Sequence, residues 1–315
     1  MDLRLAIEID QVDESTLDPL RRAVHGTEMV RAAFAAQRID GSWGEHDRPE
    51  RRILSTLAMT QTLAELGAGF HDGWSDAADF LATHAHTDDA GVFSINGRPD
   101  GVLSCYVGVA AVAYLSSGRA DLAAPQLDWI CRHQDVRTAE RRLRPDAPAH
   151  YADQLATRYG GCMARTTCLV GLAKTGRALA LAGAGGPGSL LGAIREAFLD
   201  RELLFRSDGS VLPLGVAPDR ADDWLLPTFP LGWRTDIIEV LDVVSRSGSP
   251  DDRMLPALDH LAVIRLDDGS WPLRRTFWPG DLSVRERRRA RRGSAMATLR
   301  AVVALSGVVA AVSVG

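Results

Sequence analysis

Asp236 is the acidic residue that the sequence singles out for chemistry. It lies between an aromatic, proline-marked segment, Phe229 to Trp233, and an apolar segment that starts at Ile237. Burial in such surroundings would raise the pKa of its carboxyl group and suit it to donate a proton. Thr235 and Asp236 also suit a helix cap, because an aspartate before an apolar helix can accept hydrogen bonds from the first backbone amides. The two roles are compatible, and both interpretations stay open.

Arg165 and Cys168 could act beside this acid. They precede another apolar stretch, and the N-terminus of a helix attracts anionic groups, so we expect both residues near a reacting centre as catalytic partners of Asp236. The alternative for Cys168 is an ordinary buried thiol. Lys174 is the only lysine of the chain and lies on the same stretch. It either reaches water from a helix end or, if buried, has a lowered pKa or pairs with an anion.

Aromatic residues gather late in the chain and could surround an apolar molecule. Their rings could stabilise a carbocation by cation–π contact or simply anchor loops. The expected substrate-binding residues are Tyr106, Trp224, Phe229, Trp233 and Arg234. Six arginines between positions 285 and 292 either form a solvated loop or bind an anion, such as a diphosphate or an anionic lipid.

A repeated turn organises the chain that must position these residues. Gln-Arg-Ile-Asp-Gly-Ser-Trp-Gly occupies 37–44, and Arg-Leu-Asp-Asp-Gly-Ser-Trp-Pro occupies 265–272. Asp-Gly suits a tight turn because glycine accepts positive φ, and the tryptophan that follows can cover the end of the preceding helix. A degenerate copy, Asp208 to Val211, lacks the tryptophan. The repeating unit is therefore a helix, a tight turn and a second helix.

Apolar periodicity predicts five helix pairs. Their ranges are about 17–37 with 50–66, 75–86 with 103–117, 121–133 with 161–182, 188–205 with 234–247, and 252–265 with 294–310. The second helix of each pair is the more uniformly apolar, so it should be buried on all sides. We therefore predict an all-α single domain over residues 1–315, arranged as an α/α toroid of about five helix pairs around a central apolar cavity.

The motif Gln-x-x-Asp-Gly-Ser-Trp-Gly at 37–44, followed by an apolar helix, resembles that of squalene-hopene cyclases and of the prenyltransferase and squalene-cyclase repeat superfamily. The segments Cys162 to Leu172, Phe229 to Leu241 and Asp267 to Pro272 resemble short bacterial members that form a single toroid. The resemblance implies a terpenoid-cyclase toroid. It also implies acid-initiated isomerisation or cyclisation of an isoprenoid, since class II cyclases protonate an alkene or epoxide.

The chain departs from that superfamily at its initiation motifs. It contains no Asp-x-Asp-Asp, the acid motif of class II cyclases, and no Asp-Asp-x-x-Asp, which holds magnesium in class I synthases. Protein prenyltransferases of this fold hold zinc with aspartate, cysteine and histidine. Asp236 and Cys168 could supply two of these ligands, but no histidine lies between His150 and His260. We expect no metal and no cofactor.

Composition and charge favour a globular protein that does not bind nucleic acid. The chain has 315 residues, of which 46% are hydrophobic and 24% charged, as in globular proteins, and its net charge of -5 argues against nucleic-acid binding. The first residues lack the pattern of a signal peptide, and four cysteines are too few for a disulfide scaffold. We expect a cytoplasmic protein that could contact a membrane surface. The stretch 295–315 is expected to be a buried final helix rather than a bilayer span.

Three functional hypotheses follow from these observations. The leading one is a terpene-cyclase-like enzyme that isomerises or cyclises an isoprenoid, its diphosphate or another apolar polyene, with Asp236 as the acid. The second is a non-catalytic toroid that binds a lipid, a peptide or a partner protein. The third is a zinc-dependent prenyl or thiol transferase.

Overall fold

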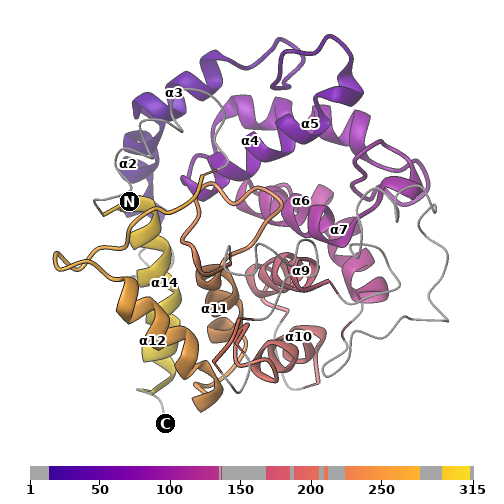
Figure 1. Cartoon of the computed structure of the whole chain (residues 1–315). Helices are drawn as coiled ribbons and strands as arrows, with labels where there is room; N and C mark the ends of the chain where they lie inside the picture. Colours follow the sequence, from indigo (N-terminus) through magenta and orange to yellow (C-terminus); the bar gives the residue numbers. More distant parts are fainter. Residues whose placement is uncertain are drawn as a thin grey trace. The chain divides into compact units, whose positions relative to one another are not determined.

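The computed structural model describes residues 14–134, 136, 168–184, 188–205, 209–211, 224–276 and 293–312 (Figure 1). All regular elements in these ranges are helices, and the few β contacts among them are isolated bridges. The predicted all-α class is therefore confirmed for the described part of the chain. The closure of the helices into a toroid and the single domain over 1–315 stay predictions.

The chain divides into two compact units. The N-terminal unit contains α2 (Glu14–His25), α3 (Glu28–Ala35), η2 (Pro49–Arg51), α4 (Ile53–Glu65), α5 (Asp72–Ala85), η3 (Pro99–Gly101), α6 (Ser104–Ser116) and α7 (Ala120–His133). The C-terminal unit contains α9 (Leu169–Leu181), α10 (Leu190–Leu199), α11 (Ile237–Arg246), η6 (Asp252–Met254), α12 (Leu255–Ile264) and α14 (Ala295–Val312).

The predicted helix pairs match these elements, with three corrections. The helix expected over 161–182 begins at Leu169, because Cys168 caps it with extended backbone, and residues 161–167 lie outside the described residues. The helix expected over 17–37 is broken after His25, because Thr27 starts a new helix by accepting a hydrogen bond from the amide of Val30. The helix expected over 188–205 ends at Leu199, and the following turn places Glu202, Leu203 and Leu204 at positive φ. In the helices expected over 17–37 and 188–205, the periodic apolar pattern continues through a turn. A prediction from periodicity alone therefore extends the helix beyond its true end.

The predicted difference in burial is confirmed for the pairs that end in α6, α9 and α11, whereas the expectation that the final helix is buried on all sides is wrong. In α6, α9 and α11, the second members of their pairs, nearly every side chain is buried. The first members α5, α7 and α12 bury one face each. The helix α14 buries Ala297, Leu299, Ala301, Val303 and Ala304, whereas Val302 and Val309 are exposed. Among the described helices, none is both long enough and apolar enough to cross a membrane.

The two copies of the repeated turn have the same backbone geometry. Gly41 and Gly269 have φ of 81° and 82°, the left-handed region that the Asp-Gly sequence predicts. In each copy the serine that follows donates its hydroxyl hydrogen to the aspartate one residue before the glycine. The degenerate copy follows the same pattern in part: Gly209 has positive φ and lies within a bridge between Phe205 and Val211, while Asp208 lies outside the described residues.

The tryptophan of each copy forms hydrogen bonds with the helices before and after the turn. The indole Nε1 of Trp43 donates to the carbonyl of Ala33 at 2.7 Å, and its backbone amide donates to Oγ1 of Thr56 at 3.1 Å. The indole of Trp271 donates to the carbonyl of Leu261 at 2.9 Å, and its amide donates to Oγ1 of Thr298, also at 2.9 Å. Each unit thus contains one such copy, which fixes a helix pair.

A third turn of this kind, which the sequence analysis missed, joins α5 to α6. His86 and Phe93 form a bridge around Gly91, and the buried Phe93 replaces the tryptophan. The amide of Phe93 donates to Oε1 of Gln126 at 2.8 Å. The signal in the sequence is Asp-Ala-Gly-Val-Phe, in which an aromatic residue follows a glycine as in the other copies.

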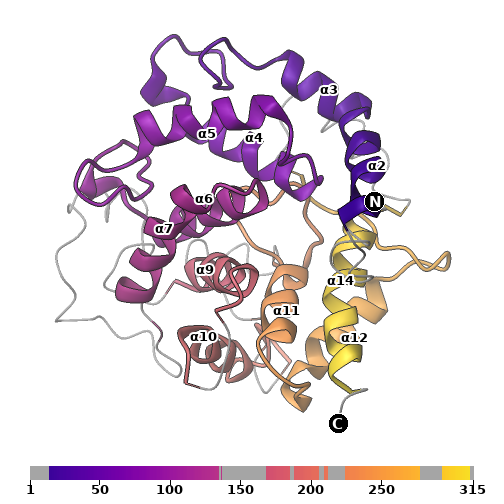
Figure 2. The same cartoon turned by 180° about the vertical axis from the view of Figure 1, so that it is seen from behind.

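The N-terminal unit is built around α4, α5 and α6. Helix α4 packs against both α5 and α6, and α6 packs against α7 (Figure 2). Ile53 and Leu57 of α4 join Trp74 and Leu81 of α5 in one buried cluster. This cluster fixes α4 along one of its faces.

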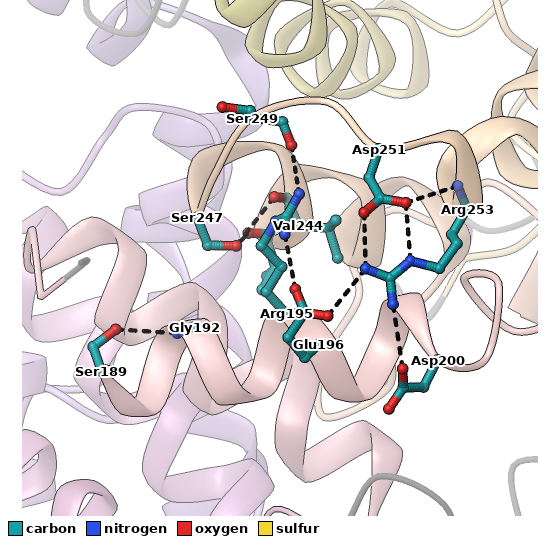
Figure 3. Close-up of polar contacts among 11 residues, drawn as sticks. Ser189, Gly192, Arg195, Glu196, Asp200, Val244, Ser247, Ser249, Asp251 and Arg253 are labelled. Carbon is teal, nitrogen blue, oxygen red and sulfur yellow. Dashed lines mark hydrogen bonds and ion pairs between the residues drawn. The ribbon is translucent and has the colours of Figure 1, made fainter. Parts of the chain in front are cut away.

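The C-terminal unit is held by close helix contacts and by ion pairs at its surface. Helix α11 packs on both α9 and α14, and a Cβ on Gly176 of α9 would lie 2.7 Å from Val243 of α11, so glycine permits this approach. The guanidinium of Arg253 in η6 contacts Asp251, Glu196 and Asp200, which joins η6 to α10 (Figure 3). Hydrogen bonds from Arg253 lower the pKa of Asp251 to about 2.

Removal of one indole N–H tests the turn as a structural element. We expect Trp43→Phe to lower the free energy of unfolding by about 0.5–1.5 kcal/mol, because the buried carbonyl of Ala33 loses one of its two donors and keeps only the amide of Ala36. Denaturant unfolding of the purified chain measures this change. Ile39→Ala is the matched control, since Ile39 lies in the same turn but is fully exposed and should change stability by less than about 0.5 kcal/mol. Equal effects of the two variants would contradict the role assigned to Trp43.

A half-buried histidine next to the third turn predicts acid sensitivity. Burial lowers the pKa of His86 from 6.5 to about 4 in the folded chain. Below about pH 6.5 the unfolded chain therefore binds a proton at this histidine, whereas the folded chain does not. The free energy of unfolding should fall by about 3 kcal/mol as the pH drops toward 4. Urea unfolding between pH 7 and 4 should show this loss, and His86→Asn should reduce it.

Tyr114→Phe is the control for this experiment. The Tyr114 hydroxyl lies 2.8 Å from Nε2 of His86, but burial rather than this contact lowers the pKa. The variant should therefore keep the pH dependence of the wild type. An unchanged slope in His86→Asn would show that another group causes the acid loss.

Candidate functional site

Asp236, the predicted acid, caps helix α11 and is fully buried. Its Oδ1 accepts from the amide of Glu239 at 2.9 Å and from Arg300 at 2.8 Å. Its Oδ2 accepts from the amide of Thr228 and from Arg300, both at 2.8 Å. The predicted capping role is confirmed. All four hydrogen bonds, from three residues, are donated to the carboxyl oxygens, which is the environment that suits a carboxylate. The catalytic role of Asp236 stays a prediction.

Arg300 joins three parts of the C-terminal unit. It comes from α14, forms a bidentate ion pair with Asp236 and also donates to the carbonyl of Thr228 at 2.5 Å. Thr228 belongs to the aromatic loop 224–236 and forms an isolated bridge with Arg275. The Asp236–Arg300 pair therefore fixes α11, α14 and the aromatic loop together. Sequence analysis missed this partner, although a lone arginine in an apolar helix was its signal.

A second buried ion pair lies one helical turn further along α11. Nζ of Lys174 lies 2.9 Å from Oε2 of Glu239, and Nη1 of Arg177 lies 3.2 Å from Oε1. Burial by itself raises the pKa of Glu239, but the charges of Lys174 and Arg177 and the hydroxyl of Thr235 outweigh it, so the pKa is lowered. The prediction that Lys174 reaches water from a helix end is wrong. The alternative, a buried lysine paired with an anion, is confirmed.

The predicted substrate-binding residues are distributed over both units. Phe229 is buried, precedes a cis peptide bond to Pro230 and donates its amide hydrogen to the carbonyl of Arg275 at 3.2 Å. Trp233 is partly exposed, and the guanidinium of Arg234 lies 5.0 Å from the centre of its ring. Trp224 is fully buried. These four residues belong to the aromatic loop next to Asp236. Tyr106 instead lies on α6 in the N-terminal unit, where the centre of its ring is 6.4 Å from the centre of the Phe93 ring.

The other predicted site residues lie around α9 or outside the described ranges. Cys168 caps α9, and its Sγ accepts from the amide of Gly171 at 3.4 Å. Arg165, Cys162 and the arginines of 285–292 lie outside the described residues. Within the described ranges, no three side chains among histidine, cysteine, aspartate and glutamate are placed to hold a metal ion.

Comparisons with known proteins add no relative. No protein-family model matches the chain, and a search of curated proteins finds no match either. The buried charges of Asp236, Arg300, Glu239, Lys174 and Arg177 are therefore interpreted from their geometry. They form a fixed, hydrogen-bonded cluster at the start of α11, and this cluster holds the aromatic loop in place.

The Lys174–Glu239 pair predicts a large cost for removing one charge. Lys174→Met should lower the free energy of unfolding by about 3–5 kcal/mol, because a buried carboxylate loses a partner. The double variant Lys174→Met/Glu239→Gln should recover most of this loss. Denaturant unfolding of the wild type, both single variants and the double variant gives the coupling energy.

Arg246→Met is the matched control for the buried pair. Arg246 pairs with Asp242 on the same helix α11, but both side chains are partly exposed. Its removal should therefore cost less than about 1 kcal/mol. A loss in Lys174→Met as small as this would contradict a tightly coupled buried pair.

Proposed function

We propose that the chain forms an α/α toroid of the squalene-cyclase and prenyltransferase repeat type and binds an isoprenoid or a similarly apolar polyene. The observation that carries this proposal is the repeated Asp-Gly-Ser-Trp turn. Both copies place the tryptophan indole on a carbonyl of the preceding helix and its amide on a threonine of the following helix. This agreement supports a true structural repeat, which the resemblance to that superfamily requires.

The geometry of Asp236 favours binding without chemistry at this residue. An acid that initiates cyclisation must carry a proton and present it to an alkene. Asp236 instead accepts four hydrogen bonds, two of them from Arg300. In this arrangement its carboxylate positions the aromatic loop, where Phe229 and Trp233 would contact an apolar ligand.

The acid-initiated isomerase or cyclase is the second candidate. Two observations favour it: Asp236 is fully buried, and it lies directly beside the aromatic loop. In this case Arg300 would have to release the carboxylate before it takes up a proton. That proton would then pass to an alkene carbon of the ligand and leave a carbocation, which the nearby rings stabilise.

Native mass spectrometry with turnover assays separates the two candidates. The purified chain is incubated with squalene, farnesol, geranylgeraniol and farnesyl diphosphate, and products are identified by gas chromatography. We expect a retained isoprenoid and no product. A product that disappears in Asp236→Asn would establish the second candidate, and retention of none of the four probes would overturn the proposal.

The double variant Asp236→Asn/Arg300→Gln controls for stability. Asp236→Asn alone leaves the largely buried guanidinium of Arg300 without its carboxylate, which should cost about 3–5 kcal/mol. Removal of both charges avoids this cost. The double variant should therefore fold and, under the binding proposal, retain the same isoprenoid as the wild type.

A further inference from the structure

The loop that leads into α6 contains the only asparagine of the chain. Asn96 is followed by Gly97, and both residues are partly exposed. An asparagine before a glycine loses its side-chain amide most readily, because glycine has no Cβ that shields its backbone nitrogen. The sequence and the exposure therefore mark Asn96 as a position where water could change the chain chemically.

The side chain of Asn96 is held in one orientation by hydrogen bonds to its oxygen and to its nitrogen. Its Oδ1 accepts from the backbone amide of Arg98 at 3.0 Å. It also lies 2.8 Å from Oγ of Ser94, whose hydroxyl hydrogen it shares with the carbonyl of Arg98. Its Nδ2 donates to Oδ1 of Asp100 at 3.1 Å. The reverse orientation would place the amide oxygen against a carboxylate, so these contacts assign the two atoms.

These contacts bring together the atoms that react in deamidation. The hydrogen bond from the Arg98 amide to Oδ1 spans the peptide bond between Asn96 and Gly97, so it folds the side chain back over the nitrogen of Gly97. The same hydrogen bond draws electrons from Cγ toward Oδ1 and would stabilise the negative charge that forms on this oxygen. The nitrogen of Gly97 donates to the carbonyl of Ser94 at 3.5 Å, a long contact that holds it weakly.

We propose that Asn96 is a site of spontaneous deamidation, an inference that does not depend on the proposed function. Hydroxide removes the proton from the Gly97 nitrogen, which then bonds to Cγ of Asn96. The bond from Cγ to Nδ2 breaks, and the nitrogen leaves as ammonia after it takes a proton from water, which restores the hydroxide. The succinimide ring that remains adds water at either of its two carbonyl carbons and opens to aspartate or isoaspartate. Water is thus consumed, ammonia is released, and nothing is oxidised or reduced.

The aspartate that forms would repel its neighbour in the loop. It carries an oxygen where Nδ2 of Asn96 donates to Oδ1 of Asp100, so two carboxylates would face each other across 3.1 Å. Arg98 contacts the other oxygen of Asp100 at 3.2 Å, but its side chain is 72% exposed, and water weakens this attraction. Deamidation thus replaces an attraction inside the loop with a repulsion.

The loop 94–101 is closed over the amide of Asn96. The backbone amide of Ile95 donates to the carbonyl of Gly101 at 3.0 Å, and a Cβ on Gly101 would lie only 2.1 Å from Oδ1 of Asn96. Isoaspartate adds a methylene group to the backbone at this point, so it displaces the chain from this close packing. Either product of deamidation therefore opens the loop directly before α6.

Ageing of the purified chain tests the modification. The folded chain and the same chain unfolded in guanidinium chloride are kept at mildly alkaline pH, and mass spectrometry of the peptide that contains Asn96 follows the loss of its amide. We expect the folded chain to react no more than about tenfold more slowly than the unfolded chain, because the closed loop already holds Cγ over the attacking nitrogen. Asn96→Gln should keep its amide in both states, since the longer side chain closes the ring less readily. A folded chain that reacts more slowly than this limit would overturn the site.

An exchange of the two side chains tests the effect on the loop. Asn96→Asp copies the aspartate product, so hydrogen exchange at the amides of Ile95 and Arg98 should become at least about tenfold faster than in the wild type. Asn96→Asp/Asp100→Asn again places an amide opposite a carboxylate and keeps the net charge of the wild type. Its amides should therefore exchange within about threefold of the wild-type rates. Equal exchange rates in the single and the double variant would show that the pair does not close the loop, and would overturn the proposed opening.

Discussion

The C-terminal unit depends on the ion pair between Asp236 and Arg300. Both groups are removed from water, so each is tolerated only because the other satisfies it. The carboxylate also caps α11 and binds the amide of Thr228, so one group fixes a helix start, a neighbouring helix and a loop. The same requirement applies one turn later to Glu239, whose two cationic partners both come from α9. Pairing of buried charges thus sets the relative positions of α9, α11 and α14.

The repeated turn joins two consecutive helices to each other. The glycine at positive φ reverses the chain, and the tryptophan then binds backbone on one side and a threonine hydroxyl on the other. Since all these contacts lie within about thirty residues of each other, the motif can form wherever it occurs in the chain. This explains why one device recurs in both units, and why a phenylalanine with a glutamine partner can replace it before α6.

Local patterns made most of the fold predictable, whereas the site depended on contacts distant in sequence. Helix ranges, the Asp-Gly turns and the cap at Asp236 follow from residues within a few positions of one another. The pairing of Asp236 with Arg300 and of Lys174 with Glu239 joins residues more than sixty positions apart, so no local signal names the partner. Lys174 was misjudged for this reason.

The burial of Lys174 has a consequence for the chemistry of the protein surface. It is the only lysine in the chain, and its Nζ is enclosed with Glu239. Acetylation of lysine, ubiquitin attachment to lysine and cross-linking through lysine all need an accessible Nζ. The folded chain presents none, while its many arginines supply positive charge that these reactions do not consume. Reaction of a lysine with an activated ester would therefore report opening of the C-terminal unit.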